Sequence, residues 1–163
     1  MTFGYTGKIL KINLNDLSYS IENKSEYFYR TFMGGSAMAS YFLLTEMGKG
    51  VDPLGPDNVL VVTTSILTGT PLPGANRYTM AAKSPLTEGF GESEAGGFFA
   101  LQLKKAGFDA VVIKGKASKP VYIWLSEGEV EFRDASHLWG QDTGYAQYKI
   151  REELNDPRIM MVS

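Results

Sequence analysis

Arg77 is the residue best placed in this sequence to bind an anion, because it shares one stretch of the chain, from Gly74 to Phe99, with two glycine-rich turns and an expected helix start. We expect that helix to begin at Ser93 or Glu94, close to Gly96, and to run to about Ala106. A guanidinium group and the free N–H groups at a helix N-terminus both attract phosphate. The pattern therefore predicts a site for a phosphate-bearing or otherwise anionic ligand, without indicating a reaction.

These residues also have structural explanations. Arg77 has no obvious acidic partner over Tyr78–Ala82, so it could be an ordinary exposed arginine, since arginine is seldom buried. Gly96 and Gly97 could let a helix pack closely on a sheet, or let a planar or phosphorylated ligand approach the backbone. The sequence leaves both alternatives open.

Two carboxylates and one histidine complete the set of candidates. Glu92 and Glu94 would suit the dipole of the expected helix, and as hard oxygen donors they could also help to hold Mg²⁺. His137 has no neighbouring residues of the kind needed for nucleophilic catalysis, so we expect a structural role in a turn.

Composition and net charge exclude several kinds of partner and metal site for this chain. A length of 163 residues suits one domain with a real core. The net charge of −2 gives no basic field for nucleic acid or an anionic membrane. The sequence has no cysteine and one histidine, so it holds no disulfide, thiolate-bound cluster or multi-histidine metal site of its own.

The sequence shows neither a secretory signal at its N-terminus nor an apolar run long enough to span a membrane. Met1–Gly7 lacks a basic region followed by an apolar stretch. The longest apolar run, Val59–Val62, falls far short of the ~20 residues that span a bilayer. We therefore expect a cytoplasmic protein.

The elements that must position these residues follow from apolar periodicity and turn residues. Helices are expected over Glu26–Arg30, Ala37–Met47 with Ser36 as its cap, Ser93–Ala106, and Tyr145–Leu154. Strands are expected over Lys8–Leu14, Tyr19–Glu22, Val59–Thr64, Tyr78–Ala82, Val111–Ile113, Val121–Leu125 and Val130–Phe132. Ile159–Val162 would begin a further strand, as in a domain cut from a longer protein. Gly34-Gly35 and Gly96-Gly97 each precede a helix and a strand, which is compatible with duplication or chance.

Several short segments together carry a family resemblance over essentially the whole chain. In their order and spacing they resemble the N-terminal domain of the tungsten-dependent aldehyde:ferredoxin oxidoreductases. The segments are Tyr5–Leu10, Asn13-Leu14, Val51–Asn58, Leu67–Thr70, Arg77-Tyr78, Ala82–Thr87, Ala95–Phe99, Leu103–Asp109, Gly115–Ala117 and Arg133–Gly140.

The resemblance implies one cofactor-seating domain over residues 1–163, truncated at its C-terminal end, with an α+β fold of duplicated, antiparallel-rich sheets and packed helices. It also implies a bis-pterin cofactor carrying tungsten (or molybdenum). Arg77 matches an arginine between the pterin and an iron–sulphur cluster, and Gly96 matches a backbone contact to the pterin. The backbone carbonyl of Glu94 would help to bind the Mg²⁺ that bridges the pterin phosphates. Ser93 and Ala95 lie in the same cofactor-binding stretch.

Three positions depart from the family pattern. Ser36-Ala37 stands where Arg-Gly-Leu often follows the glycines, Ser65-Ile66 replaces Gly-Pro, and Glu94 stands where asparagine is common. The acidic side chain at Glu94 adds negative charge beside the pterin phosphates, which Mg²⁺ or Arg77 would have to compensate. These departures bear on subfamily and substrate more than on the fold.

The function that the resemblance implies is oxidation of an aldehyde to a carboxylic acid, with electrons passing to ferredoxin through a [4Fe–4S] cluster. The cluster ligands and the acid–base residues would lie outside this chain, so we expect no catalytic residue here and an inactive fragment. The expected partners are ferredoxin and the remaining domains of the same polypeptide, with a homodimer left open, and neither nucleic acid nor membrane.

Two alternatives stay open. The parent could be a degenerate paralogue that keeps the fold as a cofactor-free binding or assembly module. It could also be a related reductase acting on another substrate class, such as an aromatic acyl thioester.

Overall fold

The computed structural model describes residues 4–163, so Met1–Phe3, the start of the N-terminal segment discussed above, lie outside the described residues. Six strands form a mixed sheet in the order β2-β1-β6-β3-β4-β5. Its strands are β1 (Lys8–Asn13), β2 (Ser18–Asn23), β3 (Leu60–Thr63), β4 (Arg77–Lys83), β5 (Phe90–Gly96) and β6 (Ala110–Lys114). A second sheet consists of β7 (Val121–Ser126) and β8 (Glu129–Asp134). The helices are α1 (Glu26–Phe32), α2 (Gly35–Glu46), α3 (Phe99–Lys105) and α4 (Thr143–Glu153).

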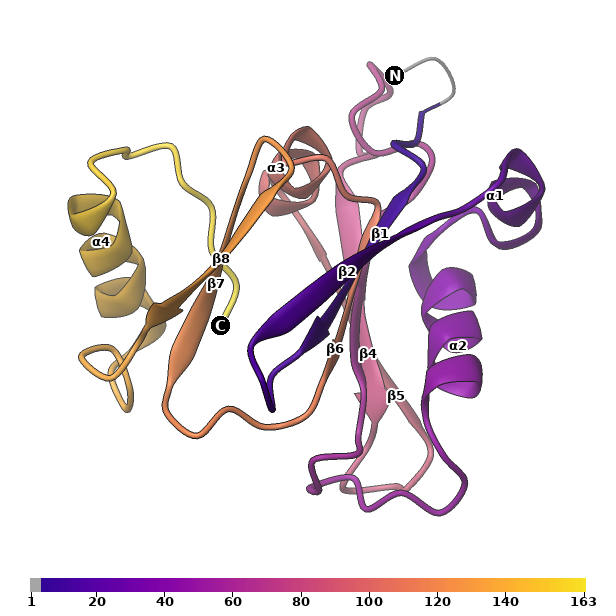
Figure 1. Cartoon of the computed structure of the whole chain (residues 1–163). Helices are drawn as coiled ribbons and strands as arrows, with labels where there is room; N and C mark the ends of the chain where they lie inside the picture. The colour runs from indigo at the N-terminus through magenta and orange to yellow at the C-terminus, as the bar shows by residue number, and fades with distance from the viewer. Residues whose placement is uncertain (1–3) are drawn as a thin grey trace.

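The central strands of the six-stranded sheet are buried on both faces, because they carry apolar side chains at successive positions. Ile9 and Val61 belong to the core on the side of α1 and α2. Leu10 and Val62, one position further along each strand, belong to the core on the side of α3 and the β7–β8 sheet. Figure 1 shows the resulting layers, with α1 and α2 to one side of the sheet and β7–β8 followed by α4 to the other.

The small second layer is a tight hairpin covered by one helix. Glu127 and Gly128 both have positive φ, 52° and 89°, as the two central residues of a type I′ turn require. Ala146 and Ile150 of α4 pack with Leu138 and Ile159 in a separate cluster.

The α+β class is confirmed, and the helices expected near Glu26, Ala37 and Tyr145 are present within a few residues of their predicted bounds. The predicted cap of α2 and the predicted final strand are wrong. Gly34, and not Ser36, is the cap position of α2. Residues 159–162 lie outside any strand of the described chain, although Ile159 is buried.

The helix predicted over Ser93–Ala106 is wrong in its first half. Phe90–Gly96 is the edge strand β5, which pairs with β4 along its full length, and α3 begins only at Phe99. Gly97, with φ of 111°, turns the chain between the two elements. Strand pairing with β4 outweighs the weak local preference of a polar, glycine-containing segment.

Candidate functional site

Cross-strand pairing between β4 and β5 assembles the candidate site around Arg77. Thr79 lies directly opposite Glu94, and Arg77 opposite Gly96. Directly paired residues project to the same face of a sheet, here the face that α2 covers through Ala81. Nη1 of Arg77 lies 3.9 Å from Oε2 of Glu94. The acidic partner that was not apparent near Arg77 in the sequence therefore comes from the neighbouring strand.

Thr79 connects this pair to the interior. Its hydroxyl donates a hydrogen bond of 3.4 Å to Oε1 of Glu94. The side chain of Thr79 is nearly fully buried, whereas Arg77 and Glu94 leave 64% and 49% of their side chains exposed. The arginine and glutamate are thus held at the sheet surface with their charged ends open to solvent.

The helix N-terminus on this face of the sheet belongs to α2 and not to the predicted helix. Ser93 and Glu94 lie in a strand, so no helix begins there. Gly35 is the first residue of α2 and lies beside Thr79. A Cβ atom added to Gly35 would lie 3.6 Å from Oγ1 of Thr79. The N–H groups in the first turn of a helix have no intrahelical partner. In α2 the N–H of Gly35 donates to the carbonyl of Thr64 at 3.1 Å, and no side chain caps the helix. The Gly34-Gly35 pair ahead of an apolar helix was the sequence signal that could have pointed here.

The remaining predicted residues lie on the same edge but differ in orientation. Glu92 pairs with Ala81 and so shares the face of Glu94. Ser93 and Ala95 pair with Met80 and Tyr78, whose side chains belong to the opposite face. No neighbouring atom lies within 4 Å of the position that a Cβ atom on Gly97 would occupy. An edge strand also presents unpaired backbone groups on its outer side, so Ser93 and Ala95 offer a ligand mainly their backbone.

A buried polar cluster, which the sequence did not reveal, fixes the N-terminal segment to the sheet. The carboxylate of Asp109 accepts hydrogen bonds from the N–H groups of Thr6 and Gly7, at 2.8 to 3.0 Å, and from the hydroxyls of Thr6 and Tyr29, at 2.9 and 2.7 Å. Nζ of Lys104 lies 3.5 Å from the same carboxylate and donates to the carbonyl of Gly4.

Burial governs the protonation of this cluster. It lowers the pKa of Lys104, and the nearby Asp109 only partly opposes that effect. Burial also raises the pKa of Tyr29 far above its usual value, and the charge of Asp109 adds to the increase. The hydroxyl therefore stays protonated and donates to the carboxylate, which is typical of a structural network rather than of an acid–base pair.

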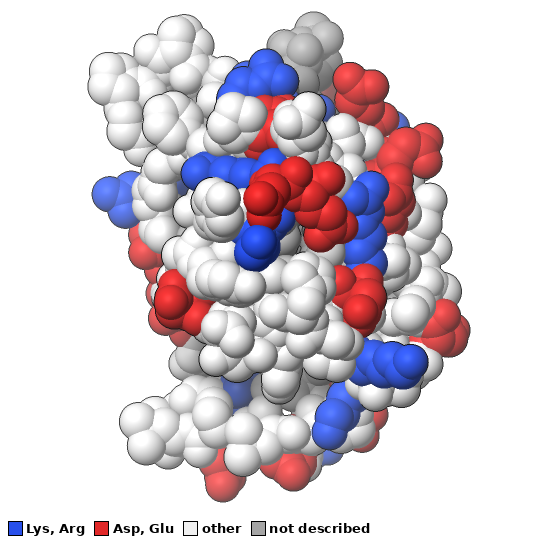
Figure 2. Space-filling view, turned by 90° about the vertical axis from the view of Figure 1, so that its left-hand side faces the viewer, with Lys and Arg blue, Asp and Glu red and all other residues white. Residues whose placement is uncertain are grey.

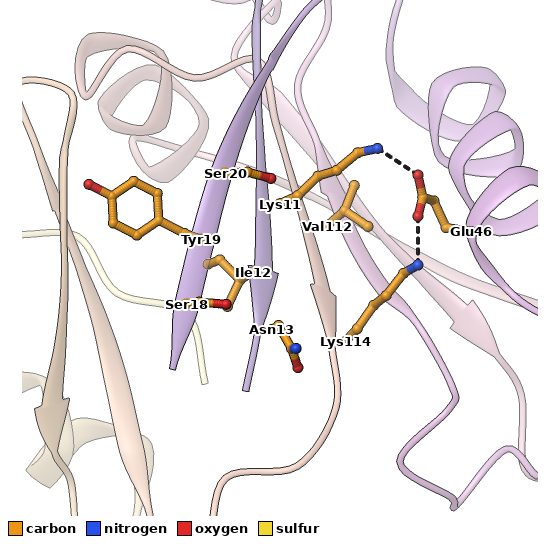
Figure 3. Close-up of a pocket in the computed structure, with 9 residues that line it drawn as sticks. All are labelled: Lys11, Ile12, Asn13, Ser18, Tyr19, Ser20, Glu46, Val112 and Lys114. Atoms are coloured by element: carbon orange, nitrogen blue, oxygen red, sulfur yellow. Dashed lines mark hydrogen bonds and ion pairs between the residues drawn. The ribbon is translucent and has the colours of Figure 1, made fainter. Parts of the chain in front are cut away.

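A second charged cluster lies at a small cavity of about 190 Å³ beside β1, β2 and β6. Figure 3 shows Glu46, from the end of α2, between Lys11 and Lys114, which donate to its two oxygens at 2.7 and 2.6 Å. Burial alone would raise the pKa of Glu46, but these hydrogen bonds outweigh it and lower the pKa. Both lysines are engaged by the glutamate, so the cluster joins α2 to the sheet.

A larger cavity, of about 560 Å³, is an apolar groove between the six-stranded sheet and the β7–β8 layer. Its walls include Val62 and Met80 of the sheet and Ile123 and Leu125 of the hairpin. Figure 2 shows the side of the molecule that carries α4 and the second sheet, where charges of both signs lie among broad uncharged areas. His137, on this layer, lies 3.8 Å from Glu153 and is half exposed. The groove offers packing surface rather than reactive groups.

Two kinds of feature are absent from the residues that the structure describes. Within residues 4–163, no three histidine, cysteine, aspartate or glutamate side chains lie close enough together to hold a metal ion. No helix in that range has the length and apolar character needed to cross a bilayer.

With this geometry established, comparison with known proteins identifies the family. Residues 9–163 match the family described as aldehyde ferredoxin oxidoreductase, N-terminal domain. The chain belongs to this family. The tungsten-containing aldehyde ferredoxin oxidoreductases of Pyrococcus horikoshii and Pyrococcus abyssi are 41% and 42% identical to it over 161 residues, 99% of this chain.

More distant relatives share the same domain. The WOR-like subunit of an aliphatic sulfonate oxidoreductase from Pyrococcus furiosus is 37% identical over 90% of this chain. A solved structure of the active-site complex BamBC of benzoyl coenzyme A reductase superposes with a TM-score of 0.92 at 33% identity, over 96% of this chain and 24% of that one. The chain spans about a quarter, 26%, of the length of the two Pyrococcus enzymes.

Proposed function

We propose that this chain is the cofactor-seating domain of an oxidoreductase that carries a tungsten (or molybdenum) bis-pterin, oxidises aldehydes to carboxylic acids and passes electrons to ferredoxin. Membership of the aldehyde ferredoxin oxidoreductase family supports the reaction class. The observation that carries the cofactor role is the exposed guanidinium of Arg77 on the sheet face covered by α2, whose N-terminus has no side-chain cap.

The residues present fit an anionic pterin cofactor. Arg77 offers several N–H donors, and within residues 4–163 its nearest carboxylate oxygen is as far away as 3.9 Å. A guanidinium and a helix N-terminus are the groups that bind phosphate best. The open space at Gly97 and the outer edge of β5 leave room for a planar ring to approach the backbone. When bound, the metal and its dithiolenes would supply the redox chemistry.

This chain would bind and orient the cofactor. Arg77 would neutralise phosphate charge and hold the pterin toward an iron–sulphur cluster, while the backbone of Ser93, Glu94, Ala95 and Gly96 would line the pterin. The carbonyl of Glu94 would be a ligand of the Mg²⁺ between the phosphates. Since the Glu94 side chain is itself negative, Arg77 at 3.9 Å and the Mg²⁺ would together offset its repulsion of phosphate.

The rest of the reaction would depend on other parts of the polypeptide. The sequence has no cysteine, so a [4Fe–4S] cluster would need ligands from outside this chain. We place the whole protein in the cytoplasm, with ferredoxin as its electron acceptor.

The experiment is elemental and pterin analysis of the full-length protein, purified anaerobically, beside its Arg77→Ala variant. Tungsten or molybdenum near one per chain with pterin in the unaltered protein, and a marked loss of both in the variant, is the expected result. Arg30→Ala is the matched control, because Arg30 is also a mostly exposed arginine, on α1, and is paired with Glu26 at 2.8 Å. A folded protein without metal or pterin would instead support a cofactor-free assembly module.

A second candidate is a reductase of aromatic acyl thioesters, favoured by the superposition on the benzoyl coenzyme A reductase complex. It would use the same cofactor-binding face. Assays of the metal-loaded protein with aldehydes and with aromatic acyl thioesters distinguish the two candidates, since only one substrate class should be turned over.

A further inference from the structure

The loop that leads into Arg77, residues 65–76, is closed at its base by one buried hydroxyl. Oγ1 of Thr68 accepts a hydrogen bond of 3.2 Å from the N–H of Ser65, where the loop begins. The same oxygen lies 3.3 Å from the carbonyl of Ala75 and 3.3 Å from that of Arg77, where the loop ends. Thr68 is 1% exposed although its neighbours in the loop are open to solvent.

The residues at the start of the loop are held by hydrogen bonds to the sheet and to the segment between α1 and α2. Thr64, just before the loop, donates to the backbone carbonyl of Asp109 through both its N–H and its hydroxyl, each at 2.9 Å. Ser65 forms a β-bridge with Gly34, and the N–H of Ile66 donates to the carbonyl of Met33 at 3.0 Å. The beginning of the loop therefore cannot shift without moving α1, α2 and β6.

The second side of the closure is the backbone of Arg77 itself. A second, independent contact supports it, because the N–H of Gly69 donates to Oδ1 of Asn76 at 3.0 Å. The side chain of Arg77, by contrast, is mostly exposed and has its one ion-pair contact, among the described residues, at 3.9 Å. The position of the guanidinium thus depends on its backbone, which Thr68 connects to the anchored segment.

We propose that Thr68 is a positioning residue for the cofactor-binding face: it holds the backbone of Arg77 so that the guanidinium meets the anionic cofactor. This inference rests on the proposed function. The Thr68 hydroxyl hydrogen-bonds to backbone groups, including the carbonyl of Arg77, so its effect would pass through the backbone of Arg77.

The test uses the full-length protein with the Thr68→Val and Thr68→Ser variants. Valine keeps the volume and removes the hydroxyl, whereas serine keeps the hydroxyl. Metal and pterin content after purification, and the rate at which both are lost on dialysis, are the readouts. We expect about fivefold faster loss for the valine variant, the change that one net hydrogen bond implies, and near-normal retention for the serine variant.

Thr70→Val is the matched control. The Thr70 hydroxyl lies in the same loop and donates to the carbonyl of Leu67 at 2.6 Å, away from the base of the loop. Its removal should leave retention unchanged. If the Thr68→Val protein does not fold, Asn76→Ala opens the other side of the base at a less buried position and should produce the same faster loss.

A double variant separates positioning from a general loss of structure. In an Arg77→Ala background, Thr68→Val should cause no additional loss, because the residue through which it acts is absent. A further loss in that background, or unchanged retention in both Thr68→Val and Asn76→Ala while Arg77→Ala loses cofactor, would overturn this inference and leave the proposed function intact. Absence of metal and pterin from the unaltered protein would overturn both.

Discussion

The ammonium group of Lys104 lies 3.5 Å from the carboxylate of Asp109, with both side chains almost completely removed from solvent, at 0% and 2% exposed. The pair connects α3 with the start of β6, and its hydrogen bonds extend to Gly4, Thr6 and Gly7 in the N-terminal segment. It is therefore a junction between elements distant in sequence.

Asp109→Asn should be strongly destabilising, by about 3–5 kcal/mol, because it leaves the buried charge of Lys104 without its partner. It also places amide hydrogens against the N–H groups of Thr6 and Gly7. Lys105→Met, at the exposed neighbouring position, should change the free energy of unfolding by less than about 0.5 kcal/mol. Denaturant unfolding measures both, and similar values for the two variants would contradict a structural role of the pair.

Tyr29 should make stability sensitive to alkaline pH. Its pKa is raised in the fold by burial and by Asp109, so its stabilising contribution is complete below the ordinary tyrosine pKa of about 10. The contribution is lost progressively as the pH rises from about 10 toward the raised value, because the unfolded chain releases the proton first.

The measurement is the urea midpoint of the unaltered protein and of Tyr29→Phe between pH 8 and pH 11. The variant should be less stable at pH 8 by about 1.5–3 kcal/mol, since it loses a hydrogen bond to a charged group. The difference should shrink above pH 10. Tyr27→Phe, at a position 79% exposed, is the control. A difference that stays constant with pH would show that Tyr29 ionises normally in the fold.

Glu46 should contribute to stability at neutral pH and lose that contribution in acid. Its pKa is lowered overall because the hydrogen bonds from Lys11 and Lys114 outweigh burial. The stabilisation is therefore present above the unfolded value of about 4.3 and disappears as the pH falls through the lowered value. Since Lys114 is 39% exposed, solvent screening limits the effect to about 1 kcal/mol.

Glu46→Gln tests this expectation by thermal unfolding at pH 7 and pH 3. The variant should unfold at a lower temperature at pH 7, while the two proteins should converge at pH 3. Glu26→Gln, in the exposed pair with Arg30, should show almost no effect at either pH. Equal destabilisation of Glu46→Gln at both values would exclude its charge as the cause.

Gly34→Ala should be among the most destabilising single changes in the chain. Gly34 has φ of 123° and ψ of −168°, a conformation that only glycine adopts easily. An added side-chain carbon would also overlap the backbone of Thr64 and Ser65. Strain and overlap together should cost about 4 kcal/mol or more.

Gly50→Ala is the matched comparison for Gly34→Ala. Gly50 also has positive φ, 74°, but no atom lies within 4 Å of the added carbon. It should cost only the left-handed backbone penalty of about 1–2 kcal/mol. Equal losses in denaturant unfolding would mean that the contact with Thr64 and Ser65 contributes nothing.

The sequence by itself determined the elements whose pattern is local. Apolar strands such as Val111–Ile113 and the helices beginning near Glu26, Gly35 and Thr143 follow from side-chain periodicity and turn residues, which need no knowledge of distant neighbours. Family membership was likewise recognisable, because the short motifs keep their order along the chain. Arg77 was also apparent as a candidate, since its residue type and neighbouring glycines are local features.

Tertiary structure alone decided what lies next to Arg77. The polar segment Phe90–Gly96 becomes a strand only because β4 supplies its hydrogen-bond partners, and this pairing brings Glu94 to Arg77. The helix N-terminus on that face belongs to α2, which begins at Gly35, far from the predicted helix in the sequence. The hydrogen bonds from the N–H groups of Thr6 and Gly7 to Asp109 likewise join groups that lie 103 and 102 residues apart in the sequence. Hydrogen bonding and charge pairing act between groups that are close in space, and periodicity along the chain carries no information about which distant groups meet.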